Sequence, residues 1–245
     1  MKNVAIFGAT SAIAEQVARL FAADGARIYL VARRADHLER IAADLRVRGA
    51  AEVFTCILDF DDTANLAAML DDCGRRLGDV SVALVAFGTL GDQERCKRDI
   101  QAAQAELHTN FMAPALLLTG LAQRMEDRKG AVIAAIGSVA GDRGRQSNYV
   151  YGAAKGGLDI LLEGLRHRLA GKGVAVVTIK PGFVDTPMTA SFPKGPLWAK
   201  PEKVAADIMR AIEKRRPVAY TPGFWRLIML AIKYVPRAIF YKTKL

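Results

Sequence analysis

Short apolar runs alternate with stretches of helical periodicity, and this alternation limits the possible folds more than any other feature. The apolar runs are Val4–Phe7, Arg27–Ala32, Val53–Leu58, Val80–Phe87, Ala131–Ile136, Val174–Ile179 and Val218–Tyr220. The helical patterns reach about Ala23 in the first case and then cover Ala35–Arg48, Asp61–Arg76, Gln93–Leu107, Asn110–Met125, Tyr151–Leu169 and Pro201–Lys214. Such repeats favour parallel strands covered on both faces. The chain is therefore predicted to be α/β, with a doubly wound parallel sheet of about seven strands.

Composition and length favour one domain. The chain has 245 residues, of which 51% are hydrophobic, and this is enough for one substantial core. No linker or repeat interrupts it, so residues 1–221 are expected to form the domain and 222–245 a distinct tail. The apolar run near Met1 is too short for a signal peptide. Cys56, Cys73 and Cys96 lie far apart, which favours a reducing, cytoplasmic setting without disulfides or a bound metal.

The net charge of +10 is unevenly distributed. After Glu213 the chain has eight basic residues and no acidic one, and aromatic and aliphatic residues such as Trp225 lie among them. Pro236 should break any single tail helix. This pattern is typical of a segment that lies on an anionic membrane surface. The alternatives are a tail that packs on a neighbouring subunit and one that covers the active site. The pattern is not that of a nucleic-acid-binding module.

The first apolar run leads into a glycine turn and then a helix. Strand, tight turn and helix is the arrangement that places a helix N-terminus against a phosphate. The candidate cofactor-binding residues here are Gly8, Thr10, Ser11, Ala12 and Ile13. Ala12 and Ala14 stand where a dinucleotide loop has its later glycines, and each methyl narrows the approach to a pyrophosphate. An ordinary strand-to-helix turn is the alternative.

The second apolar run ends in Ala32, Arg33 and Arg34, where an NAD site would place a carboxylate for the ribose 2′-hydroxyl. A guanidinium instead matches a 2′-phosphate, so Arg33 and Arg34 favour NADP(H). A solvated pair at a helix start is the alternative. Asp59, which ends the third run, is placed either to bind an adenine amino group or to cap the next helix.

Tyr151 and Lys155 lie four residues apart, and on a helix they share one face. A nearby cation is expected to favour the phenolate and lower the pKa of Tyr151, so the pair is a candidate acid/base unit. Tyr149 lies on a different face and is not chosen as the acid. A half-buried aromatic beside a solvated lysine is the alternative for the pair taken alone.

Together these residues resemble the short-chain dehydrogenase/reductase family over Val4 to about Ile212. The matching positions are the Gly8 loop, Asp59, Asn110, Ser138, Tyr151 with Lys155, and Pro181-Gly182 followed by Thr186. The resemblance implies a Rossmann fold and hydride transfer between NADP(H) and a carbonyl or alcohol carbon. It also implies that Tyr151 is the general acid, that Ser138 binds the carbonyl oxygen, and that Lys155 holds the nicotinamide ribose. Asn110 would hold a water that links Lys155 to solvent.

The remaining cofactor contacts expected from the resemblance are Phe87, Gly88, Pro181, Gly182, Val184 and Thr186. Two departures affect this expectation. Alanines replace glycines in the first turn, and Val85–Gly88 replaces the family's Asn-Asn-Ala-Gly, which removes the asparagines that brace the central sheet. The segment Met188–Trp198 is rich in proline, glycine and large apolar residues, which favours a mobile lid. A surface loop that packs its own aromatics is the alternative.

Flanking motifs, among them Val85–Asp92 and the tail around Trp225, resemble a branch of the family that reduces a keto-pentose carried on a polyprenyl phosphate. The resemblance implies such a lipid-linked substrate and a peripheral membrane location. The alternatives are a reductase or dehydrogenase of another lipid or small-molecule ketone or alcohol, and a non-catalytic NADP-binding scaffold. The family also implies a homo-dimer or homo-tetramer assembled through two long helices.

Overall fold

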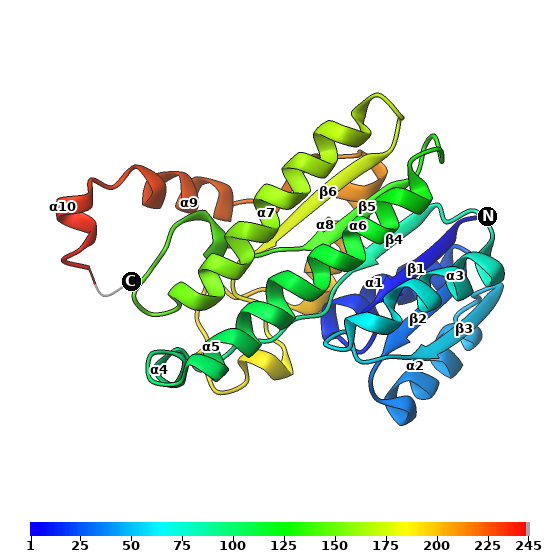
Figure 1. The fold of residues 1–245 in the computed structure, drawn as a ribbon, viewed down its shortest axis with the longest axis horizontal. Coiled ribbons are helices and arrows are strands. Elements are labelled where there is room, and N and C mark those ends of the chain that lie inside the picture. The colour runs from blue at the N-terminus through cyan, green and yellow to red at the C-terminus, as the bar shows by residue number, and fades with distance from the viewer. Residues whose placement is uncertain (244–245) are drawn as a thin grey trace.

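The computed structural model describes residues 1–243, and a seven-stranded parallel sheet runs through its centre (Figure 1). The strands lie in the order β3-β2-β1-β4-β5-β6-β7. Their bounds are β1 Asn3–Phe7, β2 Arg27–Ala32, β3 Glu52–Ile57, β4 Val82–Val85, β5 Val132–Ile136, β6 Ala175–Pro181 and β7 Val218–Thr221. The order reverses between β1 and β4, so their carboxyl ends form the switch point at which doubly wound sheets bind ligands. The expected fold class is confirmed.

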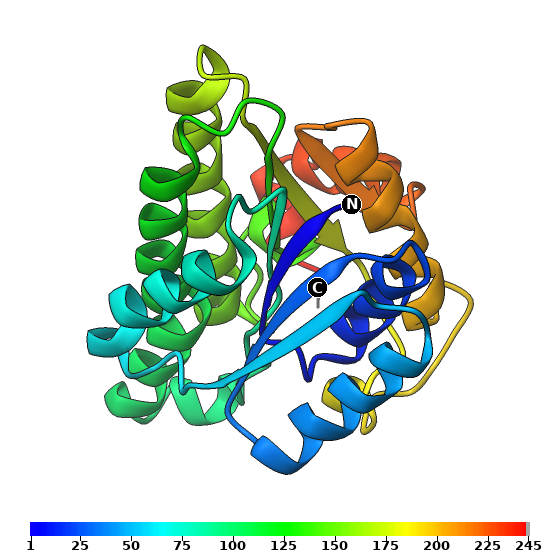
Figure 2. The same ribbon diagram turned by 90° about the vertical axis from the view of Figure 1, so that its right-hand side faces the viewer.

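Helices cover both faces of the sheet (Figure 2). One face packs against α1 Ala12–Ala23, α2 Ala35–Val47 and α8 Pro201–Glu213. The other packs against α3 Leu66–Leu77, α6 Ala113–Met125 and α7 Tyr149–Ala170. Each face has its own apolar core, which is why strands β1, β4 and β5 are apolar at almost every position.

Several element bounds differ from the expectation, and each difference has a local cause. The helix expected over Gln93–Leu107 is two helices, α4 Gln93–Cys96 and α5 Ile100–Leu107, because Asp99 accepts hydrogen bonds from two backbone amides and starts the second one. Similarly, Asp62 caps a 3-10 turn, Thr63–Asn65, ahead of α3. The helix expected to begin at Asn110 instead begins as a π-helical turn, His108–Met112, that continues into α6. Such turns recur at functional sites.

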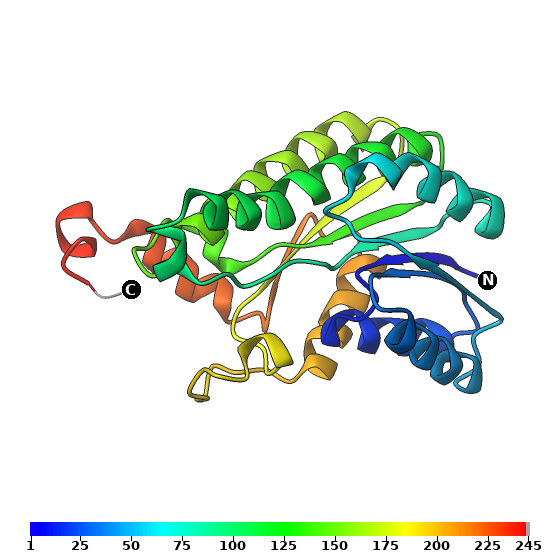
Figure 3. The ribbon, with the colours of Figure 1, turned by 60° about the horizontal axis from the view of Figure 1, so that its bottom comes forward.

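The tail forms α9 Trp225–Tyr234 and a short α10 Arg237–Phe240, and Pro236 separates them as expected (Figure 3). Trp225 and Met229 are buried against Val139. The Arg143 guanidinium donates hydrogen bonds to the carbonyls that end α9 and lies over the Phe240 ring. The tail is therefore docked on its own domain. Among residues 1–243, no helix combines the length and the apolar character needed to cross a membrane.

Candidate active site

A cavity of about 940 Å³ opens at the carboxyl ends of the strands and extends to the tail. Its walls come from the β1–α1 turn, the ends of β4, β5 and β6, the start of α7 and the first residue of α9. Segments far apart in the sequence meet here because every parallel strand delivers its carboxyl end to the same edge of the sheet. The cavity is large enough for a dinucleotide together with a small substrate.

Ser138, Tyr151 and Lys155 meet in one wall of this cavity. Ser138 follows β5, and its hydroxyl accepts a hydrogen bond from the backbone amide of Ala140 at 3.1 Å. One turn after Tyr151 on α7, Lys155 is only 4% exposed, and its Nζ lies 5.7 Å from the centroid of the Tyr151 ring. The structure thus brings the three expected catalytic side chains together, whereas Tyr149 is 46% exposed and does not line the cavity.

The expectation that a nearby cation lowers the pKa of the phenol is wrong for the protein alone. Burial raises the pKa of Tyr151 to about 12, and the hydrogen bond from Ser138 only partly opposes this. Burial also lowers the pKa of Lys155 to about 8, against the opposing fields of Glu106 and Asp159. Tyr151 therefore carries its proton at neutral pH, as a general acid must.

Asn110 is fully buried and bonded to the loop that follows β4. Its carboxamide oxygen accepts from the Thr89 amide at 3.2 Å, and its nitrogen donates to the Thr89 hydroxyl at 3.0 Å and to the Glu106 carboxylate at 2.9 Å. Glu106, itself 6% exposed, also accepts from the Thr89 hydroxyl and from the Gly91 amide, each at 3.0 Å. A carboxylate on α5 thus braces the loop from which the family's asparagines are missing.

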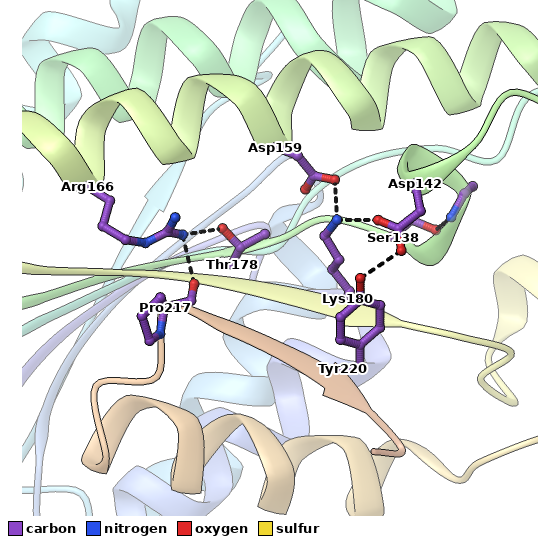
Figure 4. Close-up of polar contacts among 9 residues, drawn as sticks. Ser138, Asp142, Asp159, Arg166, Thr178, Lys180, Pro217 and Tyr220 are labelled. Atoms are coloured by element: carbon purple, nitrogen blue, oxygen red, sulfur yellow. Dashed lines mark hydrogen bonds and ion pairs between the residues drawn. The ribbon is translucent and has the colours of Figure 1, made fainter. Parts of the chain in front are cut away.

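A second buried cluster lies behind Ser138 (Figure 4). Lys180 of β6 forms ion pairs with Asp142, in the turn that Ser138 begins, and with Asp159 of α7 at 2.7 Å. Tyr220 of β7 donates to the second Asp142 oxygen at 2.7 Å. Burial alone would lower the pKa of Lys180, but the two carboxylates outweigh it and raise that pKa. Strands β6 and β7 and helix α7 are thereby fixed to the Ser138 turn.

The other end of the cavity has the shape that a dinucleotide needs. Gly8 adopts a φ of +87°, and a Cβ there would lie 2.6 Å from the Phe87 nitrogen, so only glycine fits this close approach of β1 and β4. Thr10, Ser11, Ala12 and Ile13 line the cavity around the N-terminus of α1. Ala14 points into the core and is fully buried, so its methyl group does not occupy the ligand space. These residues fit a bound pyrophosphate.

The charges at this end are exposed. Arg33 and Asp59 both line the cavity, with side chains 60% and 52% exposed, and their charged atoms lie 3.9 Å apart. Asp59 also accepts from the Asp61 amide at 3.2 Å, a turn-type bond, whereas the cap of the following helical turn is Asp62. Arg34 lies outside the cavity lining, and its guanidinium contacts His37 at 2.6 Å. Of the two arginines, only Arg33 lines the cavity.

The segment after β6 forms a further part of the cavity lining, next to residues that follow β4. Phe87, Gly88, Pro181, Gly182, Val184 and Thr186 all line it, as expected for cofactor contacts. Gly182 is required because a Cβ there would lie 2.0 Å from the Trp225 indole. Met188, Phe192 and Trp198 of the expected lid also line the cavity, and Phe183 packs between Trp198 and Trp225 with ring centroids 5.3 Å and 5.2 Å apart.

The sequence analysis did not identify several residues of this site, although helical spacing could have pointed to two of them. Glu106 lies four residues before Asn110, and Asp159 lies four after Lys155, so each shares a helix face with an expected site residue. Lys180 carried no such signal, because its partners Asp142 and Asp159 come from distant parts of the chain.

Comparisons with known proteins agree with this geometry. A family model described as short chain dehydrogenase matches residues 2–196. An uncharacterized oxidoreductase of Mycobacterium tuberculosis is 40% identical over 96% of this chain and 94% of its own, and a 3-oxoacyl-[acyl-carrier-protein] reductase of Homo sapiens is 30% identical over 77% and 78%. The structure of an actinorhodin polyketide ketoreductase with NADPH superposes with a TM-score of 0.82, at 23% identity over 91% of this chain and 97% of that one.

Proposed function

Because this chain belongs to the short-chain dehydrogenase family, and so to the NAD(P)-dependent oxidoreductases, we propose that it is an NADPH-dependent ketoreductase. The observation that carries the proposal is the meeting of Ser138, Tyr151 and Lys155 in the wall of one cavity that reaches the Gly8 turn. The similarity to a 3-oxoacyl-[acyl-carrier-protein] reductase and to a ketoreductase structure with NADPH supports it.

A bound NADPH supplies the hydride to the substrate carbon. The residues expected to hold the cofactor are Gly8, Ser11 and Ile13 at the pyrophosphate, Arg33 at the 2′-phosphate, and Lys155 at the nicotinamide ribose. Arg33 in place of a carboxylate favours the phosphorylated cofactor. Pro181, Gly182, Val184 and Thr186, which line the cavity, would complete the enclosure of a bound nicotinamide.

The proton for the substrate oxygen comes from Tyr151. With a pKa of about 12 the phenol is protonated at neutral pH, and it gives its proton as the carbonyl oxygen gains negative charge. Ser138 donates a hydrogen bond to the same oxygen and stabilises that charge where it develops. Lys155 stays close to the phenol and stabilises the phenolate that proton transfer leaves behind. Asn110 and Glu106 complete the polar path beside Lys155.

A test of the proposed function follows NADPH oxidation with a panel of ketones and deuterium transfer from 4-deuterated NADPH. Turnover with at least one ketone, and deuterium on the carbinol carbon, is the expected result. If NADPH binds but no ketone is reduced, the chain is the non-catalytic NADP-binding scaffold instead.

We propose a ketone carried on a lipid, and among these a polyprenyl-phosphate-linked keto-sugar, as the substrate to test first. Support comes from the apolar side chains Met188, Phe192 and Trp198, which line the cavity on the lid segment. The competing substrate class is a 3-oxoacyl thioester, which the similarity to the human 3-oxoacyl-[acyl-carrier-protein] reductase favours. Comparing kcat/KM for members of both classes decides between them.

We also propose that the tail meets an anionic membrane surface. On α9, the exposed Leu227, Leu230 and Tyr234 share one face opposite the buried Trp225, and no acidic residue follows Glu213. Since Trp225 is part of the cavity wall, the test replaces the exposed face (Leu227→Ser with Leu230→Ser) and measures sedimentation with anionic and neutral vesicles. The wild type is expected to bind anionic vesicles in a salt-sensitive way, and the variant is expected to lose this binding. If the wild type binds neither vesicle type, the proposal is contradicted.

Association of copies through helices α5, α6 and α7 is a further proposal. Exposed apolar side chains on these elements include Ile100, Leu116 and Ile160, which are 85%, 47% and 73% exposed. Light scattering of the wild type and of Ile160→Glu tests it, with a shift toward monomer as the expected result.

A further inference from the structure

The cavity has a polar pocket wall next to Tyr151 whose hydrogen-bonding groups are not all used. Gln93, Arg145 and Asn148 line the cavity and each keeps one buried polar atom without a hydrogen-bond partner: Nε2 of Gln93, Nε of Arg145 and Oδ1 of Asn148. Buried polar groups in folded proteins are nearly always satisfied, by protein, water or a ligand. Three unsatisfied groups in one wall therefore point to a ligand that carries polar atoms.

These three groups lie beside the reacting position rather than at the cofactor end. Asn148 precedes α7 and stands one turn before Tyr151. Gln93, at the start of α4, accepts a hydrogen bond from the Val150 amide at 3.1 Å through its oxygen, which leaves its amino group as a donor. Asn148 and Arg145 are joined through a backbone hydrogen bond of 3.2 Å. The Gly8 turn follows β1, whereas Ser138 follows β5, and β4 lies between these two strands in the sheet. We therefore assign the wall beside Tyr151 to the substrate.

Arg145 is the decisive member because it carries charge. Within residues 1–243, the Arg145 side chain forms no salt bridge, and its Nε has no hydrogen-bond partner. Burial lowers the pKa of the Arg145 guanidinium, and the nearby Asp142 only partly opposes this. A guanidinium has five donors and no acceptor, so it needs oxygens, and oxyanions match its fork best.

The acidic side chains nearby are already engaged. Both oxygens of Asp142 are taken, one by Lys180 and one by the Tyr220 hydroxyl, as Figure 4 shows. Asp92 caps α4 through the amides of Glu94 and Arg95, and Glu94 pairs with Lys97. Lys180 and Tyr220 thus occupy both carboxylate oxygens of Asp142, so the Arg145 guanidinium remains free to bind a ligand.

From this geometry we infer that the site selects ketone substrates that carry an oxyanion, a phosphate or a carboxylate, and that Arg145 binds it with Gln93 and Asn148 beside it. The inference rests on the proposed ketoreductase function and narrows its substrate class. Two sources of the oxyanion are compatible with the wall, a sugar phosphate and a free carboxylate, and they share the chemistry that Arg145 recognises.

Matched ligand pairs test the inference. One pair is a ketopentose with a phosphate on the anomeric oxygen and its methyl glycoside; the other is a 3-oxo acid and its methyl ester. Binding is measured by tryptophan fluorescence on the NADPH complex of Tyr151→Phe, so that no ketone is consumed, and kcat/KM is measured with the wild-type acid in place. The variants, made in both backgrounds, are Arg145→Met, Arg145→Gln and Arg145→Lys, with Arg98→Met as the control that removes an exposed charge outside the cavity.

The anionic member of at least one pair should bind about tenfold to hundredfold more tightly than its neutral partner, as expected for a charge-assisted hydrogen bond. Arg145→Met and Arg145→Gln should bring that ratio close to one, Arg145→Lys should keep part of it, and Arg98→Met should keep all of it. The pair that shows the ratio identifies the source of the oxyanion.

Equal affinities within both pairs in the parent protein overturn the inference, and so does a ratio that survives Arg145→Gln. If the anionic ligand binds more tightly than its neutral partner but no ketone is reduced, the proposed function is wrong and the anion site is retained. If neutral ketones are turned over without any ratio, the inference fails and the ketoreductase function stands.

Discussion

The charged side chains near the two ends of the cavity differ in burial and in the number of partners that hold them. At the inner end, around Lys155, the charged side chains of Glu106, Asp142 and Lys180 are almost completely buried, and each is held by several partners. At the outer end, Arg33 and Asp59 are more than half exposed and 3.9 Å apart. Buried charges interact strongly because little water screens them, whereas exposed pairs contribute about 0–1 kcal/mol. The inner end should therefore control chemistry and stability, and the outer end should tune only cofactor choice.

The largest effect is expected at the junction of the two ends, for Tyr151→Phe. This change removes the phenolic hydroxyl and with it the proton that the acid donates, and general acid catalysis contributes about 10²–10⁴-fold to the rate. We expect kcat to fall by that factor while NADPH affinity is retained, measured by steady-state kinetics and cofactor titration. Tyr149→Phe, on the exposed face of the same helix, is the matched control. A near wild-type rate for Tyr151→Phe on any accepted ketone would assign the acid elsewhere.

Next in size is the stability of the inner end, probed by Lys180→Met. The change leaves Asp142 and Asp159 facing each other without their cation, and breaking a buried ion pair costs about 3–5 kcal/mol. Urea unfolding should show this loss. Lys172→Met, which removes an exposed pair with Asp127, should cost less than about 1 kcal/mol. Equal losses in the two variants would remove the distinction between buried and exposed charges.

A smaller effect, on the pH dependence of turnover, is expected for Glu106→Gln. This substitution removes the negative charge of the side chain and keeps its size and shape. The groups that face Lys155 are Glu106 from α5, and Tyr151 and Asp159 from its own helix. The pKa of Lys155 is already lowered to about 8 by burial, and Glu106 opposes that shift. Without this carboxylate the pKa of Lys155 falls further, so the protonated amine is lost at lower pH.

The alkaline limb of the kcat/KM profile, near pH 8 in the wild type, should therefore move down by about one unit in Glu106→Gln. Glu163→Gln, an exposed change on α7, is the control for net charge. An unchanged limb together with a loss of stability would make Glu106 a structural brace alone.

The smallest effect is expected at the outer end, for Arg33→Ala. Its exposed guanidinium should add about fivefold to tenfold to NADPH affinity at low salt and less at high salt. NADH affinity should change little, and Arg34→Ala, outside the cavity lining, should have less effect on either cofactor. Isothermal titration with both cofactors measures this. Equal affinity of the wild type for NADPH and NADH would refute the assignment of Arg33 to the 2′-phosphate. If Arg33→Ala lowered turnover as much as Tyr151→Phe, the two ends of the cavity would not differ in the way proposed.

The sequence by itself determined the parallel sheet, because local periodicity and apolar runs decide which segments become strands and helices. The spacing of Tyr151 and Lys155 placed this pair on one helix face. Ser138 and Asn110 were identified only through the resemblance to the short-chain dehydrogenase/reductase family. The π-helical turn at Asn110 and the division of α4 from α5 were not predicted, because side-chain capping and loop bracing override a periodic pattern.

Only the tertiary structure decided how charge is arranged around these residues. Lys180 and Asp142 are 38 positions apart in the sequence, and Thr89 and Asn110, which are hydrogen-bonded, are 21 apart. No local sequence pattern predicts either contact. The same holds for the pKa of Tyr151: spacing suggests a cation that lowers it, but burial in the assembled wall raises it to about 12. Burial is a property of the packed molecule, and it outweighs the effect of a neighbour that the sequence can show.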